Sequence, residues 1–125
     1  MDPATPRPLA GRRVLVVEDN FLVALELGEE LGEAGAVVIG PCANAADALA
    51  AVAAGGIDLA VVDLNLGAGP DYTTAAALRA AGVPFALATG YDGDAVAEAF
   101  AAVPVLHKPF APNQLVAVLA GLSPA

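Results

Sequence analysis

The 125-residue chain has few basic residues, a single cysteine and no long apolar stretch free of charge. Five residues are lysine or arginine and fourteen are aspartate or glutamate, so the net charge is −9. This shortage of cations argues against nucleic-acid binding, because proteins that bind nucleic acids neutralise phosphates with lysine and arginine. No run of about 18 apolar residues lacks a charge, so we expect no membrane span. One cysteine, Cys42, excludes an internal disulfide and suits a cytoplasmic protein, in which Cys42 is expected to be a small core residue.

The composition that is present predicts one folded domain. Hydrophobic residues make up 58% of the chain, and 125 residues are enough to enclose one sizeable core. The first eleven residues carry three prolines and no apolar cluster. We therefore expect residues 1–11 to be a disordered tail, rather than a signal peptide, and residues 12–123 to form the domain.

Five short apolar runs alternate with five helical patterns along the chain. The central run, residues 59–62, is continuous and ends at Asp63, as expected of a strand that is buried on both faces. Alternating strands and helices favour an α/β fold with a parallel sheet and helices on both faces. The expected strands are residues 13–17, 36–40, 59–63, 83–88 and 103–107, and the expected helices are residues 20–34, 45–54, 72–81, 92–100 and 112–122.

Polar residues stand where four of these strands end, and parallel strands end at one edge of a sheet. The first strand is followed by Glu18 and Asp19, the third ends at Asp63, and Thr89 and Lys108 follow the fourth and fifth. Carboxylates brought this close need a cation, and hard oxygen ligands suit Mg²⁺. A carboxylate in such a site can act as a nucleophile toward phosphorus. The Lys108 ammonium and the Thr89 hydroxyl are the donors that a phosphoryl group would require.

These residues resemble the motifs of response-regulator receiver domains of two-component signalling. All four motifs occur in the order of that family and span nearly the whole chain after Gly11. The fourth strand region, Phe85–Tyr91, is similar to the signature of the "FAT GUY" subgroup, with a partial match. That subgroup consists of stand-alone receivers in bacteria, several of them linked to general stress signalling. The matching motifs are Val16–Asn20, Val62–Asn65, Ala88–Gly90 and Lys108–Phe110.

The resemblance implies a flavodoxin-like (CheY-like) five-stranded sheet of order 2-1-3-4-5 and a phosphoacceptor role for Asp63. It implies that Asp19 binds the metal directly, that Glu18 acts on it through water, and that the backbone carbonyl of Asn65 is a further ligand. It also implies a cis peptide before Pro109. The phosphodonor would be a histidine kinase or a histidine phosphotransfer protein, and a downstream protein would read the state. Such a domain is not an enzyme beyond its own phosphorylation and dephosphorylation.

Two positions depart from the family pattern. Gly67 stands where receivers usually have a proline in the loop after the phosphoacceptor, and Val105 stands where they usually have an aromatic residue on the fifth strand. Val105 is too small for the usual aromatic switch. We therefore expect Thr89 and Tyr91 to take part in the switch, with the fourth helix, fifth strand and fifth helix as the partner surface.

Two other functions share part of this pattern of residues. A hydrolase of the haloacid dehalogenase type also uses an aspartyl phosphate, but it places its nucleophile on the first strand, with a second aspartate two residues later. Here Asp63 is followed by Asn65, which disfavours that function. A degenerate receiver acting only as an interaction module is disfavoured by the intact set of acidic residues, threonine and lysine.

Overall fold

The computed structural model describes residues 7–64, 72–89, 100, 102–108 and 110–122. These form five parallel strands in the order β2-β1-β3-β4-β5, as expected from the sequence. The strands are β1 (Arg13–Val17), β2 (Val37–Cys42), β3 (Leu59–Asp63), β4 (Phe85–Thr89) and β5 (Val105–His107). The helices within the described ranges are α1 (Phe21–Glu33), α2 (Ala45–Ala54), α3 (Thr73–Ala80) and α4 (Pro112–Gly121).

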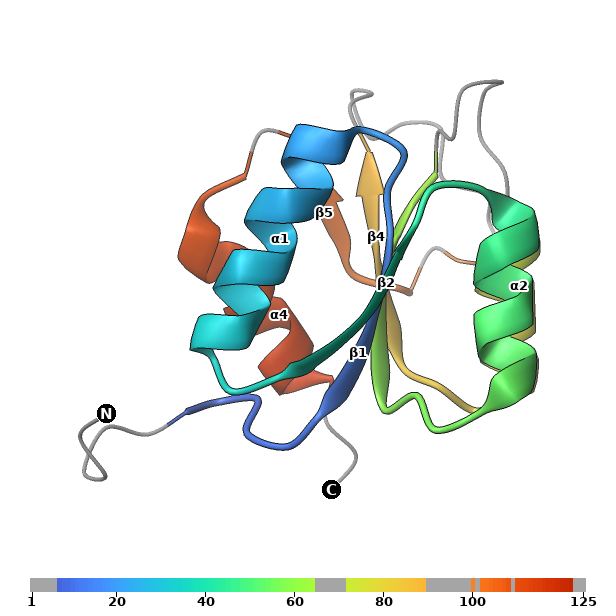
Figure 1. Cartoon of the computed structure of the whole chain (residues 1–125), viewed down its shortest axis with the longest axis horizontal. Coiled ribbons are helices and arrows are strands. Elements are labelled where there is room, and N and C mark those ends of the chain that lie inside the picture. Colours follow the sequence, from blue (N-terminus) through green and yellow to red (C-terminus); the bar gives the residue numbers. More distant parts are fainter. Residues whose placement is uncertain (1–6, 65–71, 90–99, 101, 109, 123–125) are drawn as a thin grey trace.

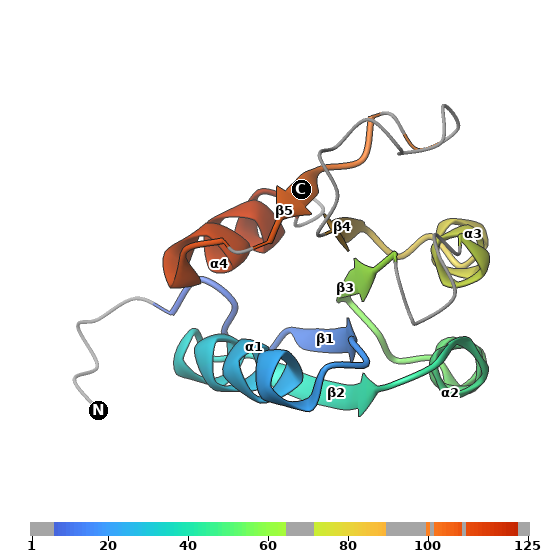
Figure 2. The ribbon, with the colours of Figure 1, turned by 90° about the horizontal axis from the view of Figure 1, so that it is seen from above.

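The helices lie in two layers with the sheet between them. Figure 1 shows α1 and α4 on one side of the sheet and α2 on the other, and Figure 2 adds α3 beside α2. The central strands β1, β3 and β4 are short continuous apolar runs because both of their faces are covered. Alternate residues of the same strand serve the two layers: Val14 and Val16 pack with α1 and α4, whereas Leu15 and Val17 pack toward α2 and α3.

The fifth expected helix, residues 92–100, falls almost entirely outside the described residues. Phe100 is described and is buried, at 7% exposure. Its ring stacks on Tyr72 with 5.2 Å between ring centroids, and the guanidinium carbon of Arg79 lies 4.3 Å from the ring centroid. Phe100, at the end of that expected helix, therefore contributes to the core beside α3. No helix in the described ranges is long and apolar enough to cross a membrane.

The second strand is longer than the sequence predicted. We expected it to end before Pro41, but β2 continues to Cys42. The register changes from Leu15 opposite Ile39 to Val17 opposite Cys42, so β2 carries one extra residue. Gly40 permits this bulge, because its φ of 97° is one that residues with side chains rarely adopt. Pro41 is tolerated because β2 is an edge strand, where an amide donor can be spared.

The folded part of the chain also begins earlier than expected. Leu9, which we placed in the disordered tail, is fully buried in the core cluster beside α1 and α4. Its amide donates to the carbonyl of Ala34 at 3.0 Å, and the amide of Gly11 donates to the carbonyl of Gly35 at 3.0 Å. One leucine in a proline-rich segment gives no periodic signal, which is why the sequence alone did not reveal this contact.

Candidate functional site

The carboxyl ends of β1, β3, β4 and β5 bring the predicted site residues to one edge of the sheet. In the register of the central strands, Val17 lies opposite Val62, so Glu18 follows β1 beside Asp63. Thr89 lies opposite His107, and the amide of Lys108 donates to the Thr89 carbonyl at 2.8 Å. The parallel topology therefore positions all four residues from backbone pairing alone, as is usual for ligand sites in open α/β sheets.

Three carboxylates converge at this edge. One oxygen from each of Glu18, Asp19 and Asp63 lies within 4.8 Å of the others. Glu18 and Asp63 are buried, at 2% and 4% exposure, whereas Asp19 is exposed. A group of carboxylates at this separation repels itself unless a cation compensates it, and the donor set fits a small hard cation such as Mg²⁺.

Lys108 supplies part of this compensation in the structure. Its ammonium donates to Asp63 Oδ2 at 3.0 Å and to Glu18 Oε1. Burial lowers the pKa of Lys108, but its hydrogen bonds to Glu18 and Asp63 outweigh burial, and its pKa lies above the ordinary 10.5. Lys108 is therefore a fixed cation at neutral pH, held between two carboxylates.

Burial disfavours the charged form of Glu18, and two hydrogen bonds favour it. Burial raises its pKa above the ordinary 4.5, and the hydrogen bond from Lys108 and the amide of Asn20 oppose this rise. That amide donates to Glu18 Oε2 at 3.0 Å. Both oxygens of the carboxylate thus accept a hydrogen bond, which fixes its orientation.

Asn20 is a supporting residue to which we assigned no role from the sequence. Its Oδ1 accepts from the amides of Leu22 at 3.0 Å and Val23 at 3.2 Å, which caps α1. Its own amide holds Glu18. The signal that could have revealed this is an asparagine directly before a helical pattern, the common sequence mark of an N-cap.

The two described switch candidates lie on different parts of the sheet. Thr89 is buried at 2% exposure at the end of β4, next to the site. Val105 is half-buried on β5, opposite Leu87, and packs against the core cluster beside α2 and α3. Asn65, Gly67, Tyr91 and Pro109 lie outside the described residues, so the roles expected for them stay predictions.

The arrangement combines an acidic cluster with a fixed ammonium and a buried threonine. The carboxylates can hold a divalent cation, and the exposed Asp19 leaves the cluster open to solvent. A phosphoryl group needs such a cation and further donors for its oxygens. The geometry therefore suits phosphoryl chemistry at the end of β3.

Comparisons with known proteins agree with this geometry. SdrG from Sphingomonas melonis Fr1, in solution, is 39% identical, with a TM-score of 0.79 over 90% of this chain and 96% of that chain. Its BeF3-activated conformation, reported from Pseudomonas melonis Fr1, gives the same identity and a TM-score of 0.78 over 90% and 97%. The receiver domain of the sensor histidine kinase PA1611 from Pseudomonas aeruginosa PAO1, solved with a magnesium ion in its active-site cleft, is 25% identical, with a TM-score of 0.76 over 90% and 98%.

No match was found among curated proteins. The sequence model of the response regulator receiver domain, by contrast, matches residues 14–120, which extend from the second residue of β1 to the penultimate residue of α4. Together with the converging carboxylates at the sheet edge, this match identifies the chain as a member of the response regulator receiver family.

Proposed function

We propose that Asp63 accepts a phosphoryl group from a histidine kinase or a histidine phosphotransfer protein, and that a protein partner reads the resulting state. The observation that carries this proposal is the ammonium of Lys108, which bonds Asp63 and Glu18 within the acidic cluster. A lysine held against the acceptor carboxylate is placed to donate to a phosphoryl group formed there.

Mg²⁺ is the proposed cofactor. Glu18, Asp19 and Asp63 would hold it, with the backbone carbonyl of Asn65 as a further ligand, and the three carboxylates fit a hard cation. When bound, Mg²⁺ would neutralise charge that otherwise repels the incoming phosphoryl group. The relative PA1611 binds magnesium in its active-site cleft.

The proposed reaction is an exchange of one bond at phosphorus. An oxygen of Asp63 forms a bond to phosphorus, the bond from phosphorus to the donor imidazole nitrogen breaks, and the imidazole leaves with that electron pair and takes a proton from solvent. Lys108 and the Thr89 hydroxyl donate to the phosphoryl oxygens as charge develops on them. Hydrolysis reverses the modification: water adds to phosphorus and releases inorganic phosphate and the free carboxylate.

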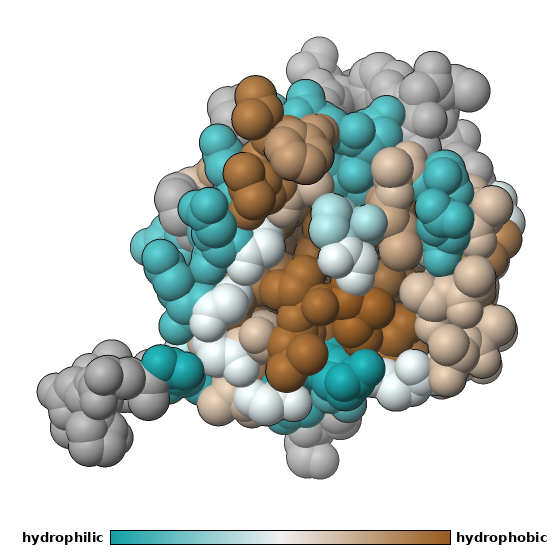
Figure 3. Space-filling model, viewed as in Figure 1, coloured by the Kyte–Doolittle hydropathy of each residue, from teal (hydrophilic) through white to brown (hydrophobic). Residues whose placement is uncertain are grey.

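The start of α1 is the proposed contact surface for the phosphodonor. Phe21, Leu22 and Leu25 are 75%, 67% and 49% exposed, directly after the site residues Glu18 and Asp19. Figure 3 shows apolar surface at the beginning of α1 as well as over β2. Large apolar side chains exposed beside a reactive site are typical of a protein contact. Changing Leu22 to serine should slow phosphotransfer from a phosphorylated kinase but not from acetyl phosphate; equal slowing with both donors would contradict this role.

Phosphorylation-dependent binding is the proposed output. Thr89, Tyr91 and Val105 are the proposed switch positions, and the segment 92–100 together with β5 and α4 is the proposed partner surface. Since Val105 is small, movement would be read at Thr89 and Tyr91 rather than by an aromatic ring on β5. Amide shifts that change on addition of beryllofluoride only around residues 67–71, and not in residues 89–100, would contradict this switch.

Acetyl phosphate tests the central proposal. The chain incubated with acetyl phosphate and Mg²⁺ should gain the mass of one phosphoryl group, and Asp63→Asn should gain none. The matched control is Asp58→Asn at the opposite end of β3, because an amide at position 58 can still accept from the Arg13 amide. Labelling of Asp63→Asn at the level of the unaltered chain would overturn the assignment of Asp63. Absence of labelling in both chains would favour the interaction-module alternative.

A further inference from the structure

The outer side of β2 is an open edge of the sheet. The strand order ends at β2, so none of the described strands pairs with that side (Figure 2). On the inner side, the amide of Val37 donates to the carbonyl of Arg12 at 2.7 Å. The N–H and C=O groups of successive residues point to opposite sides of a strand, so those of Val38 point away from β1. The edge therefore presents one donor and one acceptor at the same residue.

The first half of β2 lacks the usual protection of an edge strand. Edge strands are kept from pairing with other chains by short length, charge, proline or bulges. The strand at the opposite edge, β5, has three residues, whereas β2 has six. The bulge at Gly40 and the proline at position 41 interrupt only the second half of β2. Residues 37–39 carry no charge, and Val37 is 48% exposed, so this half is open to pairing.

Apolar side chains lie along this half of the edge. Figure 1 looks onto the edge, with β2 crossing between α1 and α2, and Figure 3 shows apolar surface along β2 in the same view. Val38 packs against the core cluster beside α1, and Ile39 packs against the cluster beside α2. A strand added to the edge would remove apolar surface from water in both layers, which favours binding.

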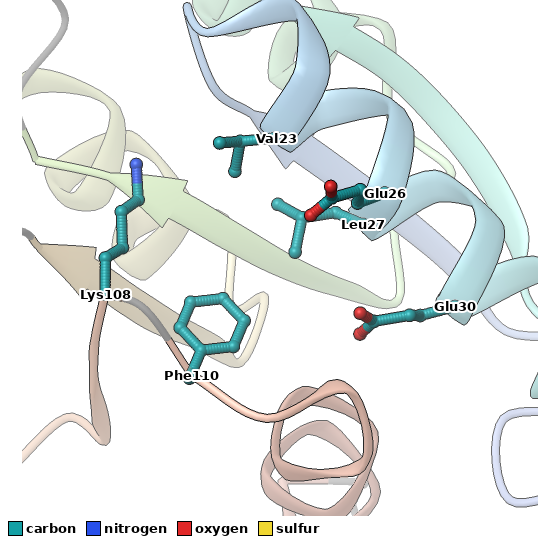
Figure 4. Close-up of a pocket in the computed structure, with 6 residues that line it drawn as sticks. All are labelled: Val23, Glu26, Leu27, Glu30, Lys108 and Phe110. Carbon is teal, nitrogen blue, oxygen red and sulfur yellow. The ribbon is translucent and has the colours of Figure 1, made fainter.

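The distribution of charge favours a second copy of this chain as that strand. The chain has a net charge of −9, so two copies repel each other where acidic surfaces meet. Figure 4 shows such a surface on the side of α1 that faces α4, where Glu26 and Glu30 direct their carboxylates into a cavity of about 340 Å³. In contrast, β2 has no charged residue between Val37 and Cys42. Two copies can meet at β2 without opposing carboxylates, and β2 offers no charge to attract a charged partner.

We propose that β2 pairs with β2 of a second copy of this chain, antiparallel and across a two-fold axis at Val38. The N–H of each Val38 donates to the C=O of the other, and Val37 of one copy packs against Ile39 of the other. A two-fold contact uses the same surface on both copies, which pairing centred on one residue satisfies. The edge lies outside the acidic cluster and outside the proposed partner surface, so this pairing goes beyond the proposed function.

Sedimentation of the unphosphorylated full chain tests the proposal. The average mass in solution of the 12.3 kDa chain should rise toward that of a dimer between about 50 μM and 1 mM, as expected of a small interface. Val37→Lys should abolish this rise, because a lysine on an edge strand opposes pairing. The matched control is Ala76→Lys, which adds the same charge at an exposed position of α3, away from β2 (Figure 2), and should not weaken the dimer. A chain that stays monomeric at about 1 mM, or equal losses in the two variants, would overturn the proposal.

Nuclear magnetic resonance tests the register of the pairing. In a mixture of isotope-labelled and unlabelled chains, a filtered experiment detects contacts between copies alone. Methyl groups of Val37 in one copy should contact those of Ile39 in the other. The Val38 amide should exchange with solvent at least about fivefold more slowly at about 1 mM than at about 50 μM, because pairing protects it. A dimer without these contacts would place the interface elsewhere and overturn the proposal.

Salt and a peptide distinguish the other occupants. Raising sodium chloride from about 50 to 500 mM should strengthen the dimer, because salt screens the repulsion between two acidic chains. A dimer that weakens with salt would be held by ion pairs, which contradicts an uncharged strand contact. The peptide probe is a hexapeptide of alternating threonine and valine. If the chain stays monomeric and this peptide shifts the Val38 amide, the edge takes an extended segment of another protein and the proposal is overturned.

Discussion

At the scale of single residues, Lys108 supplies the positive charge that offsets the carboxylates of the site. It bonds two buried carboxylates, of which Glu18 has a pKa raised by burial in spite of that bond. Its own side chain is 23% exposed, so part of its charge is still solvated. Removing it would leave the carboxylates facing one another without the cation that now separates them.

We predict that Lys108→Ala lowers the free energy of unfolding at pH 7 by about 1–3 kcal/mol without divalent cations. Loss of the ammonium raises the pKa of Glu18 further. A carboxyl group whose pKa is raised in the folded state stabilises the folded protein fully below pH 4.5, the ordinary pKa of glutamate. This stabilisation is lost as the pH rises through the pKa of the folded state. The deficit should therefore shrink toward pH 4.5. Urea unfolding at both pH values measures it, with Lys108→Arg as the control that keeps the charge; a deficit independent of pH contradicts the prediction.

Glu30, on α1 and outside the site, is a second carboxyl group whose pKa is raised by burial. Its Oε2 is buried without a hydrogen-bond partner among the residues that the structure describes, and burial raises its pKa, so the charged form is destabilising in the free protein. Glu30→Gln should raise the free energy of unfolding at pH 7 by up to about 1 kcal/mol, and the gain should disappear near pH 4, where the glutamate is protonated. Thermal unfolding at the two pH values checks this, with Glu29→Gln as control. A Glu30→Gln protein less stable than the unaltered chain at pH 7 would refute it.

At the scale of elements, the helix caps connect local sequence to the site. Asn20 caps α1 and Asn44 caps α2, where the amide of Asp47 donates to Asn44 Oδ1 at 2.8 Å. Only the first of these helices begins beside the acidic cluster, because the amide of Asn20 also binds Glu18. Both caps are therefore asparagines that accept from backbone amides, but only Asn20 lies beside the site.

We predict that Asn20→Ala and Asn44→Ala each lower the free energy of unfolding by about 1 kcal/mol. Asn20→Ala should in addition slow phosphorylation by acetyl phosphate, because a frayed start of α1 no longer orients Glu18. Asn44→Ala should leave that rate unchanged. Equal rates for the two variants would show that the cap of α1 has no part in holding the site.

The elements also show what the sequence could and could not predict. Apolar runs and their order predicted the five strands, because burial on both faces leaves a strong pattern in β3 and β4. The ends of elements were less predictable: Gly40 and Pro41 look like a turn but form a bulge in β2. The local sequence carries only a weak signal for such ends, because pairing with β1 determines where β2 ends in the fold.

The candidate site was predicted more completely than its surroundings. Glu18, Asp19, Asp63 and Lys108 follow from strand ends, because a parallel sheet brings those ends together, and the structure places them in one cluster. The capping role of Asn20, the burial of Leu9 and the lack of a partner for Glu30 Oε2 within the described part of the chain were not predicted. Each depends on one residue meeting a distant or non-periodic neighbour, which a pattern of residue types does not reveal.

At the scale of the whole molecule, the chain has fourteen acidic residues and five basic ones. Part of that excess of negative charge lies at the sheet edge, where Glu18, Asp19 and Asp63 meet. Mg²⁺ at ten times its dissociation constant should raise the free energy of unfolding by about 1.4 kcal/mol, because it binds the folded chain alone. Sodium chloride at matched ionic strength should give a smaller gain. The site variant Asp19→Asn should lose most of the difference between the two salts; if the difference persists unchanged in that variant, the cation binds elsewhere.

The position of the phosphoryl group tests the account most directly. After treatment with acetyl phosphate and Mg²⁺, borohydride reduces an aspartyl phosphate to homoserine and releases inorganic phosphate. Tandem mass spectrometry of the digested chain then reads which aspartate has changed. We predict homoserine at position 63 alone, and none in a sample that received no acetyl phosphate. Homoserine at position 19 with aspartate intact at position 63, or no homoserine in a chain that has gained the mass of a phosphoryl group, would contradict the assignment of Asp63 as the phosphoacceptor.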